Sequence, residues 1–335
     1  MGCNNLKRVL FRADANPKIG IGDLMSLIHL SYYFKTDGWE TFFMIRSYTA
    51  GLRLAEQYGI VNCEIIDNNI TIPEEVCAIN KFVHEKNISL IFFEVTENRV
   101  SDYVGISSDV YKACVSFDGF ILPDMDVVVD WDVEATRFFQ PEKYSKTKFL
   151  LGPEYVILPF NFDFDRIKKR KYTNTPERLL ICMGGADEFN LTCRVVNVLK
   201  KQKIKLQTTI VIGAGYAFRN ELEDSLKNAA FPCEIKENIS DMFEEYMKCD
   251  IAIGTGGLTS SELVATRTPA LLIAAYEHQV ARCKYFHKKG WVYYLGYRGF
   301  KSNEMSDNLI MVSMSNCDQF FDTYAILKAC NEFVT

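Results

Sequence analysis

The residues best suited to chemistry lie in glycine-rich segments that directly follow apolar runs. The strongest is GTGGLTSSE, residues 254–262, which follows the run DIAI and leads into a helical pattern. Glycine amides and hydroxyls at a helix N-terminus suit phosphate oxygens, and a carboxylate one turn later can accept both hydroxyls of a ribose. The segment therefore predicts a nucleotide site made of Gly256, Gly257, Thr259, Ser260, Ser261 and Glu262. A capping box of Thr259 or Ser260 with Glu262 is the structural alternative.

A second segment, MGGAD at residues 183–187, has the same position after an apolar run. Gly184 and Gly185 would expose backbone N–H groups to a diphosphate, and Asp187 is a further candidate substrate contact. The alternative is an ordinary glycine turn, with Asn190 or Thr192 capping the helix that follows.

The segment YEHQ, residues 276–279, follows the apolar run PALLIAA. We expect substrate contacts here from Glu277, His278 and Gln279, with Gln279 binding a sugar or a phosphate. A single histidine in such a position is more often structural than a base, so His278 is not assigned to catalysis.

Asp23 is the residue that we expect to act as a catalytic base. It closes the segment RADANPKIGIGD, residues 12–23, in which Gly20 and Gly22 permit close approach of the backbone to a phosphate or a sugar. Its carboxylate would take a proton from water or from an acceptor hydroxyl as that oxygen attacks an anomeric carbon. The structural alternative is a helix N-cap or an acid in the first helical turn.

Arg12 and Asp14 of the same segment are candidate substrate contacts, with a structural ion pair as the alternative. The full G-x-G-x-x-G fingerprint is not met, so NAD is not expected. The D-x-D pairs at residues 124–126 and 130–132 are interpreted as solvated loops, and the four histidines lack metal-ligand spacing. We therefore expect neither a metal nor another cofactor.

The chain alternates apolar runs with amphipathic stretches, which is the pattern of repeated βαβ units. Its 335 residues predict two α/β domains, at 1–160 and 161–320, with the second beginning near the polar stretch DRIKKRKYTNTPER. The segment LGPEYVILPFNF is expected to cross between them, beside a cleft. Residues 321–335 contain a helical pattern that we expect to pack on the first domain.

The composition excludes several classes of protein. A net charge of -5 disfavours nucleic acid as the main partner. Eleven cysteines without a C-x-x-C pair indicate reduced thiols. No stretch approaches the roughly 20 apolar residues of a membrane span. We expect a cytoplasmic protein, and peripheral contact with a membrane stays open.

Together these segments resemble the UDP-sugar hydrolases of the pseudaminic acid pathway and the related spore-coat polysaccharide proteins, which are members of the GT-B superfamily. The matching pieces are RADANPKIGIGD, LLGPEYVILPFNF, LLICMGGADEFNLT, NISDMFEEYMKCDIAIGTGGLTSSE and PALLIAAYEHQ, and they cover nearly the whole chain. The resemblance implies an α/β fold of the GT-B type, with two Rossmann-like domains facing a central cleft. It also implies that the donor nucleotide binds at GTGGLTSSE and that the reaction occurs at the first glycine-rich turn.

The chain differs from that family at the catalytic position. The hydrolases carry a histidine in an I-G-x-G-H turn, and the matching residue here is Asp23. Leu258, Ser261 and His278 stand where the family favours Ser, Trp and Asn. Some inverting GT-B glycosyltransferases are similar to this chain in having an aspartate base in the corresponding loop.

We therefore expect first an inverting, metal-independent glycosyltransferase of surface-glycan or nonulosonic acid metabolism. Its partners would be a nucleotide-sugar donor, with UDP expected ahead of CMP, and a sugar or glycan acceptor. One alternative is a hydrolase of UDP-2,4-diacetamido-2,4,6-trideoxy-hexose, in which Asp23 activates water. The other is a non-catalytic protein that binds a nucleotide-sugar.

Overall fold

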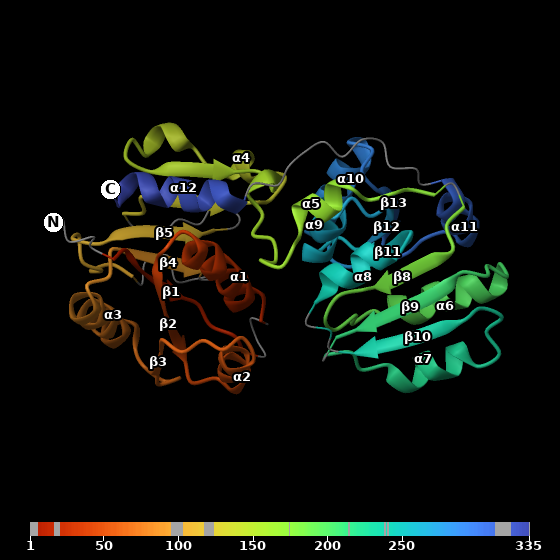
Figure 1. Cartoon of the computed structure of the whole chain (residues 1–335), viewed down its shortest axis with the longest axis horizontal. Coiled ribbons are helices and arrows are strands. Elements are labelled where there is room, and N and C mark those ends of the chain that lie inside the picture. Colours follow the sequence, from red (N-terminus) through yellow and green to blue (C-terminus); the bar gives the residue numbers. More distant parts are fainter. Residues whose placement is uncertain are drawn as a thin grey trace. The chain divides into compact units, whose positions relative to one another are not determined.

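The computed structural model describes residues 6–16, 21–94, 103–116, 124–173, 175–213, 215–237, 239, 241–311 and 323–334. The chain divides into two compact units, which we call unit 1 (residues 1–160 with 321–335) and unit 2 (residues 161–320). Each unit is built on a parallel β-sheet with helices packed against it (Figure 1).

Unit 1 contains a parallel sheet in the strand order β3-β2-β1-β4-β5-β6-β7. Its strands are β1 (Arg8–Arg12), β2 (Glu40–Arg46), β3 (Cys63–Ile66), β4 (Leu90–Glu94), β5 (Tyr111–Val115), β6 (Val127–Asp130) and β7 (Lys148–Leu151). Its helices are α1 (Gly22–Thr36), α2 (Thr49–Gln57), α3 (Ile72–Lys86), α4 (Ala135–Phe138) and α12 (Thr323–Phe333), with short 3-10 turns at η1 (Pro141–Lys143) and η2 (Pro153–Tyr155).

Helices cover both faces of this sheet, which explains why its central strands are continuous apolar runs. Successive residues of β1 point to opposite faces. Phe11 packs against Phe34 of α1, with ring centroids 5.5 Å apart. Leu10 belongs to the core cluster that includes Ile79 of α3. One face of the sheet is therefore covered by α1 and the other by α3, and we call them the α1 face and the α3 face.

Two segments that are remote in sequence complete unit 1. Val156, Ile157 and Leu158 are buried, and the Leu158 carbonyl accepts a hydrogen bond from Tyr33 Oη at 3.3 Å. The first part of the expected crossing segment is thus core of unit 1. Helix α12 packs against α1, and its Asn331 Oδ1 accepts a hydrogen bond from Lys7 Nζ at 3.1 Å.

Unit 2 contains a parallel sheet in the order β10-β9-β8-β11-β12-β13. Its strands are β8 (Arg178–Cys182), β9 (Gln207–Ile212), β10 (Cys233–Glu237), β11 (Ile251–Thr255), β12 (Ala270–Ala274) and β13 (Tyr293–Tyr297). Its helices are α5 (Phe164–Lys168), α6 (Leu191–Lys201), α7 (Arg219–Leu226), α8 (Met242–Lys248), α9 (Leu258–Ala265), α10 (Gln279–Lys288) and α11 (Ser302–Met311). Within the described ranges of both units, no helix is long and apolar enough to cross a bilayer.

Both sheets have a point at which the strand order reverses. The chain adds strands outward from β1 and then returns to β4 on the other side, and it does the same with β8 and β11 in unit 2. Loops at the carboxyl ends of such neighbouring strands diverge, and ligands of open α/β sheets bind in the crevice between them. The turns after β1, β4, β8 and β11 are therefore the places where this fold can bind a ligand.

Candidate functional site

The two glycine turns predicted in unit 2 lie on either side of its switch point, which is the place where the strand order of the sheet reverses. Gly184 and Gly185 follow β8, and Gly256 and Gly257 follow the adjacent strand β11. A Cβ atom on Gly184 would lie 3.8 Å from Thr255 Oγ1, so the two turns are neighbours. The structure therefore brings together two segments that are about 70 residues apart in the sequence.

Two of these four glycines are required by the backbone conformation or by the packing, and the other two are not. Gly184 has a φ of +85°, and a Cβ on Gly256 would lie 2.5 Å from Cys283 Sγ. Nothing lies within 4 Å of a Cβ on Gly185, and a Cβ on Gly257 meets only Gln279 Nε2 at 3.5 Å. Gly185 and Gly257 thus leave open space beside the backbone at the switch point.

Asp187 has a structural role in the first turn. Its two carboxylate oxygens accept hydrogen bonds from the backbone N–H groups of Leu191 and Thr192, both at 2.8 Å. Asp187 thus satisfies the first N–H groups of α6. Asn190 is the N-cap residue of α6, as considered from the sequence, but its side chain makes no cap hydrogen bond. Asp187 occupies the first N–H groups of α6, so an anion in this turn would meet the backbone beside Gly185 rather than the start of the helix.

Helix α9 begins differently, without a side-chain cap. Its N-cap residue is Gly257 and no side-chain cap hydrogen bond is formed, so the capping box with Glu262 is wrong. Ser260 and Ser261 are 0% and 2% exposed, and Ser260 Oγ donates to the Gly257 carbonyl at 2.6 Å. Among the three predicted hydroxyls, only that of Thr259 belongs to a partly exposed residue. The Ser260 N–H donates to the Gly257 carbonyl at 3.0 Å, and the N–H groups that precede it at a helix N-terminus favour an anion.

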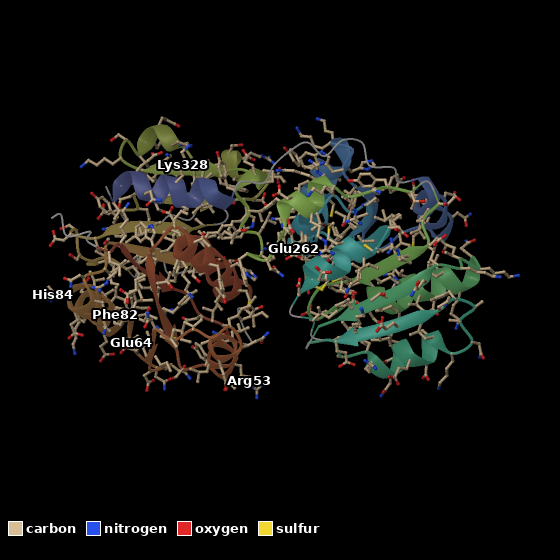
Figure 2. The ribbon with its side chains drawn as sticks, in the orientation of Figure 1. Arg53, Glu64, Phe82, His84, Glu262 and Lys328 are labelled. Atoms are coloured by element: carbon tan, nitrogen blue, oxygen red, sulfur yellow. The ribbon has the colours of Figure 1, made fainter. Side chains whose placement is uncertain are left out.

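Glu262, which is labelled in Figure 2, lies one turn further along α9. It has a partner that the sequence did not indicate. Its Oε2 accepts a hydrogen bond at 2.5 Å from Tyr246 Oη of α8, and Tyr246 is fully buried. Burial raises the pKa of Glu262, and the hydrogen bond from Tyr246 opposes this rise. The carboxyl is thereby held in one orientation, and Oε1 is the oxygen that Tyr246 does not bind.

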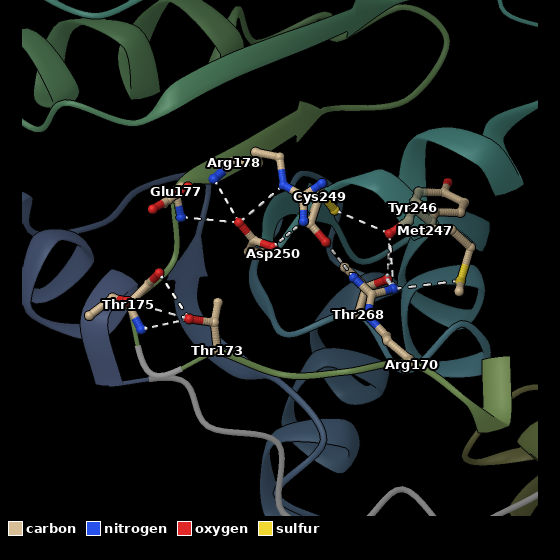
Figure 3. A network of polar contacts seen from close by, with 10 residues as sticks. All are labelled: Arg170, Thr173, Thr175, Glu177, Arg178, Tyr246, Met247, Cys249, Asp250 and Thr268. Atoms are coloured by element: carbon tan, nitrogen blue, oxygen red, sulfur yellow. Dashed lines mark hydrogen bonds and ion pairs between the residues drawn. The ribbon is translucent and has the colours of Figure 1, made fainter. Parts of the chain in front are cut away.

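Arg170 stabilises the helix that carries Tyr246 (Figure 3). Its guanidinium donates to the Tyr246 carbonyl at 2.9 Å, to the Cys249 carbonyl at 2.5 Å and to Thr268 Oγ1 at 2.9 Å. It also donates to the Thr266 carbonyl at 3.2 Å, just beyond the end of α9. One cation thus joins the C-terminal ends of α8 and α9, where it also complements their dipoles.

The turn after β12 contacts the glycine turn after β11. Gln279 is 7% exposed and its Oε1 accepts a hydrogen bond from the Ala275 N–H at 2.9 Å, so its Nε2 faces Gly257. Glu277 is exposed, and His278 is exposed and stacks on Tyr276 with ring centroids 5.7 Å apart. Of these three predicted contacts, Gln279 is the one placed directly at the switch point.

In unit 1, Arg12 and Asp14 form the ion pair considered as the structural alternative. The pair measures 2.9 Å, and the two residues are 0% and 6% exposed. Arg12 Nε also donates to Glu75 Oε1 at 2.7 Å, and Arg46 donates to Glu75 Oε2 at 2.5 Å. Burial opposes ionisation of Glu75, but Arg12 and its hydrogen-bond donors outweigh it and lower the pKa of Glu75 to about 2. The network joins β1 and β2 to α3 and leaves Arg12 and Asp14 little surface for substrate.

Asp23 lies in the first turn of α1 and is partly exposed. The N-cap position belongs to Ile21, so the N-cap interpretation of Asp23 is wrong and the first-turn position is correct. A Cβ on Gly22 would have nothing within 4 Å. Gly20 lies outside the described residues.

The D-x-D pairs are only partly solvated. Asp130 is fully buried, so its interpretation as a solvated loop residue is wrong, and its Oδ1 accepts a hydrogen bond from the Asp132 N–H at 2.8 Å. Asp126 Oδ2 accepts one from the Lys112 N–H at 2.8 Å. Among the residues with described positions, no group of three or more His, Cys, Asp or Glu side chains is arranged to hold a metal ion.

Sequence reasoning missed three residues that bear on these turns. Gly213 follows β9, and a Cβ there would lie 2.6 Å from Gly185 Cα; a glycine after an apolar run was a visible signal. Glu94 ends β4, and a carboxylate closing the run LIFFE was likewise visible. Tyr246 had no such signal, because its partner Glu262 lies on a different helix.

No family model matches the chain. An uncharacterized protein of Methanocaldococcus jannaschii, MJ1062, is 24% identical over 289 residues, which are 82% of this chain and 57% of the relative. The chain thus spans a little more than half the length of that relative.

Solved structures resemble the whole chain. MurG of Acinetobacter baumannii has a TM-score of 0.62 at 15% identity, covering 97% of this chain and 95% of MurG. The UDP-GlcNAc 2-epimerase of Neisseria meningitidis, solved with UDP-GlcNAc bound, has a TM-score of 0.61 at 12% identity, covering 97% of this chain and 100% of the enzyme. With two Rossmann-like parallel sheets and these structural neighbours, the chain has the GT-B fold expected from its sequence.

Proposed function

We propose that this chain is an enzyme of nucleotide-sugar metabolism. It transfers the sugar of a nucleoside diphosphate sugar, with inversion at the anomeric carbon, to an acceptor hydroxyl. The observation that carries the proposal is the uncapped N-terminus of α9 at the switch point of unit 2, with Glu262 one turn beyond it. An anion at the helix N-terminus and a diol at the carboxylate together describe a nucleoside diphosphate.

In this proposal unit 2 holds the donor. The N–H groups at the start of α9 and beside Gly185 and Gly257 bind the diphosphate, because these positions have room next to the backbone. Glu262 accepts hydrogen bonds from the ribose hydroxyls, and Gln279 Nε2 donates to a donor oxygen. UDP is proposed as the nucleotide, supported by the UDP-GlcNAc bound to the structurally similar enzyme of Neisseria meningitidis.

Unit 1 supplies the base. Asp23 removes the proton of the acceptor hydroxyl while that oxygen forms a bond to the anomeric carbon. The bond from the anomeric carbon to the diphosphate oxygen breaks, and the nucleoside diphosphate leaves with the electron pair. The N-terminal dipole of α9 stabilises the negative charge that grows on the leaving group.

The test is nucleotide release from a panel of UDP- and CMP-sugars, with and without sugar acceptors. It compares the wild-type chain, Asp23→Asn and the control Asp37→Asn, which changes the residue that caps the other end of α1. Release that needs an acceptor and is lost only in Asp23→Asn would support the transferase. Acceptor-independent release would make the chain a hydrolase, and binding of a nucleotide-sugar without release by the wild type would refute an enzymatic role.

A further inference from the structure

Glu94 is a buried acid at the switch point of unit 1. The proposed reaction assigns it no role. It is the last residue of β4, the strand that neighbours β1, and it is 3% exposed. The register pairs Arg12 with Phe93, so the residue opposite Glu94 on β1 is Ala13. Glu94 therefore lies at the same sheet edge as the turn that leads to Asp23.

The Glu94 carboxyl is incompletely paired. Its Oε2 is buried and, among the described residues, has no hydrogen-bond partner. Its only described hydrogen-bond partner is the side chain of Ser26, on α1. Burying an ionised carboxylate with an unpaired oxygen costs several kcal/mol, whereas a protonated carboxyl has no charge to desolvate.

The hydroxyl of Ser26 can form a hydrogen bond with either protonation state of Glu94. Ser26 Oγ donates to the Gly22 carbonyl at 3.0 Å. A hydroxyl has one proton, so once that proton is committed to Gly22, the Ser26 oxygen is left as an acceptor. A protonated Glu94 can donate to that oxygen, whereas a Ser26 proton turned toward an ionised Glu94 lowers the pKa of Glu94 and opposes the effect of burial.

The described groups that face Glu94 are few. From α1 they are Asp23, whose charge acts on Glu94, and Ser26. The residues paired with Glu94 across the sheet, Ala13 on β1 and Val115 on β5, do not titrate. The nearby cation Arg12 belongs to the α3 face, where it pairs with Glu75. Among these described neighbours no positive charge compensates Glu94.

We propose, building on the proposed role of Asp23, that Glu94 and Asp23 are a carboxyl pair that holds one proton near neutral pH, with the proton on Glu94. Two neighbouring carboxyls resist simultaneous ionisation, and the more buried one retains the proton. Glu94 is the more buried, so Asp23 stays ionised and able to act as the base. Glu94 is thus a positioning residue that determines which of the two acids is ionised.

The direction of the titration agrees with this assignment. Burial, together with the charge of Asp23, raises the pKa of Glu94 well above its ordinary value, although the hydrogen bond with Ser26 lowers it in part. The folded chain therefore binds this proton more tightly than the unfolded chain, and stability falls as pH rises from the ordinary glutamate pKa toward that of Glu94. Glu94→Gln removes this dependence.

The experiment measures the infrared carbonyl band of protonated carboxyls in the full chain, from pH 5 to pH 9 in wild type, Glu94→Gln, Asp23→Asn and the exposed control Glu85→Gln. At pH 7 we expect a band that Glu94→Gln lacks and Glu85→Gln keeps. In Asp23→Asn the same band should disappear at a lower pH, because the charge that opposes ionisation of Glu94 is gone. A band unaffected by Glu94→Gln, or a midpoint unaffected by Asp23→Asn, would overturn the pair.

Two further readouts separate the pair from the transferase hypothesis. The melting temperature of Glu94→Gln relative to wild type should rise with pH, and a difference that is constant with pH contradicts the proposal. In turnover assays, Glu94→Gln should keep the acid limb of the wild-type rate profile, because a neutral amide replaces a neutral carboxyl and leaves the ionisation of Asp23 unchanged, and a shifted acid limb contradicts the assignment. The spectra and melting curves need no substrate, so a chain that turns over no nucleotide-sugar would refute the proposed function while the carboxyl pair was still tested.

Discussion

Replacing Glu262 by Gln should weaken binding of UDP far more than it affects folding. The substitution keeps the size of the side chain, and its amide oxygen can still accept the hydrogen bond from Tyr246 Oη, which is 2.5 Å long in the wild-type structure. What is lost is the charge that strengthens hydrogen bonds from the ribose hydroxyls. Hydrogen bonds to charged groups contribute about 1.5–3 kcal/mol and those between neutral groups about 0.5–1.5 kcal/mol, so the loss of about 1–1.5 kcal/mol corresponds to a rise in Kd of about 5- to 12-fold.

Isothermal titration calorimetry with UDP and with 2′-deoxyuridine diphosphate measures this effect directly. Wild type should bind the deoxy compound more weakly than UDP, and Glu262→Gln should bind the two compounds with similar affinity, because the deoxy compound lacks one of the hydroxyls that the carboxylate accepts. Glu221→Gln, an exposed change in the first turn of α7, is the matched control. If Glu262→Gln binds UDP as tightly as wild type, the carboxylate does not contact the ribose and the assignment is wrong.

Tyr246→Phe extends the same test to pH. Burial raises the pKa of Glu262 and the hydrogen bond from Tyr246 holds it down, so removing the hydroxyl raises that pKa further. A protonated Glu262 is a poorer acceptor. UDP affinity should therefore begin to fall at a higher pH in the variant than in wild type as the solution is acidified, and identical pH profiles would contradict the reasoning.

Three further predictions follow from the glycines and the buried ions. Gly184→Ala should lower the melting temperature, since a φ of +85° costs an L-residue about 1 kcal/mol or more. Gly185→Ala should leave the melting temperature unchanged and weaken UDP binding in calorimetry, because its Cβ enters open space. Gly22→Ala should fold with unchanged or slightly higher stability, because its Cβ meets open space, but should reduce turnover if substrate approaches that backbone. Equal turnover would show that the glycine is dispensable. Glu75→Gln should destabilise the chain by about 3–5 kcal/mol in denaturant titrations at pH 7, because it leaves Arg12 undercompensated in the core. Since the pKa of Glu75 is lowered to about 2, this stabilisation is complete above pH 4.5 and is lost as pH falls toward 2, so the difference between wild type and variant should shrink in that window.

The fold could be predicted where strands are buried on both faces. The runs LIFFE of β4 and ALLIA of β12 are entirely buried, and such strands are continuous apolar segments that alternate with amphipathic helices. Edge strands carry a weaker signal. In β3 and β10, charged residues interrupt the apolar ones and most positions are at least partly exposed, so CEII and CEIKE do not stand out as strands.

The location of the candidate site could also be predicted, but not the partner of each side chain. A glycine turn after an apolar run indicates the carboxyl end of a parallel strand, and this correctly placed the turns at 184–185 and 256–257. The same pattern did not show that Arg12 would bind Glu75, 63 residues away, or that Asp187 would satisfy the first N–H groups of α6. Local patterns contain no information on contacts made through the packing of a remote helix.

The sequence alone determined the periodicity of the elements, the glycine turns between them and the chemical types available at those turns, because these depend on residues within a few positions of one another. Only the tertiary structure decided which groups are buried and which face an open turn. Arg12 and Asp14 became an internal ion pair, Glu262 acquired Tyr246 as a partner, and Glu94 was placed beside Ser26. The physical reason is that strand order and helix packing bring remote segments together. This packing fixes the desolvation and the hydrogen bonds of each charged group, and these determine its protonation state and the chemistry it can perform.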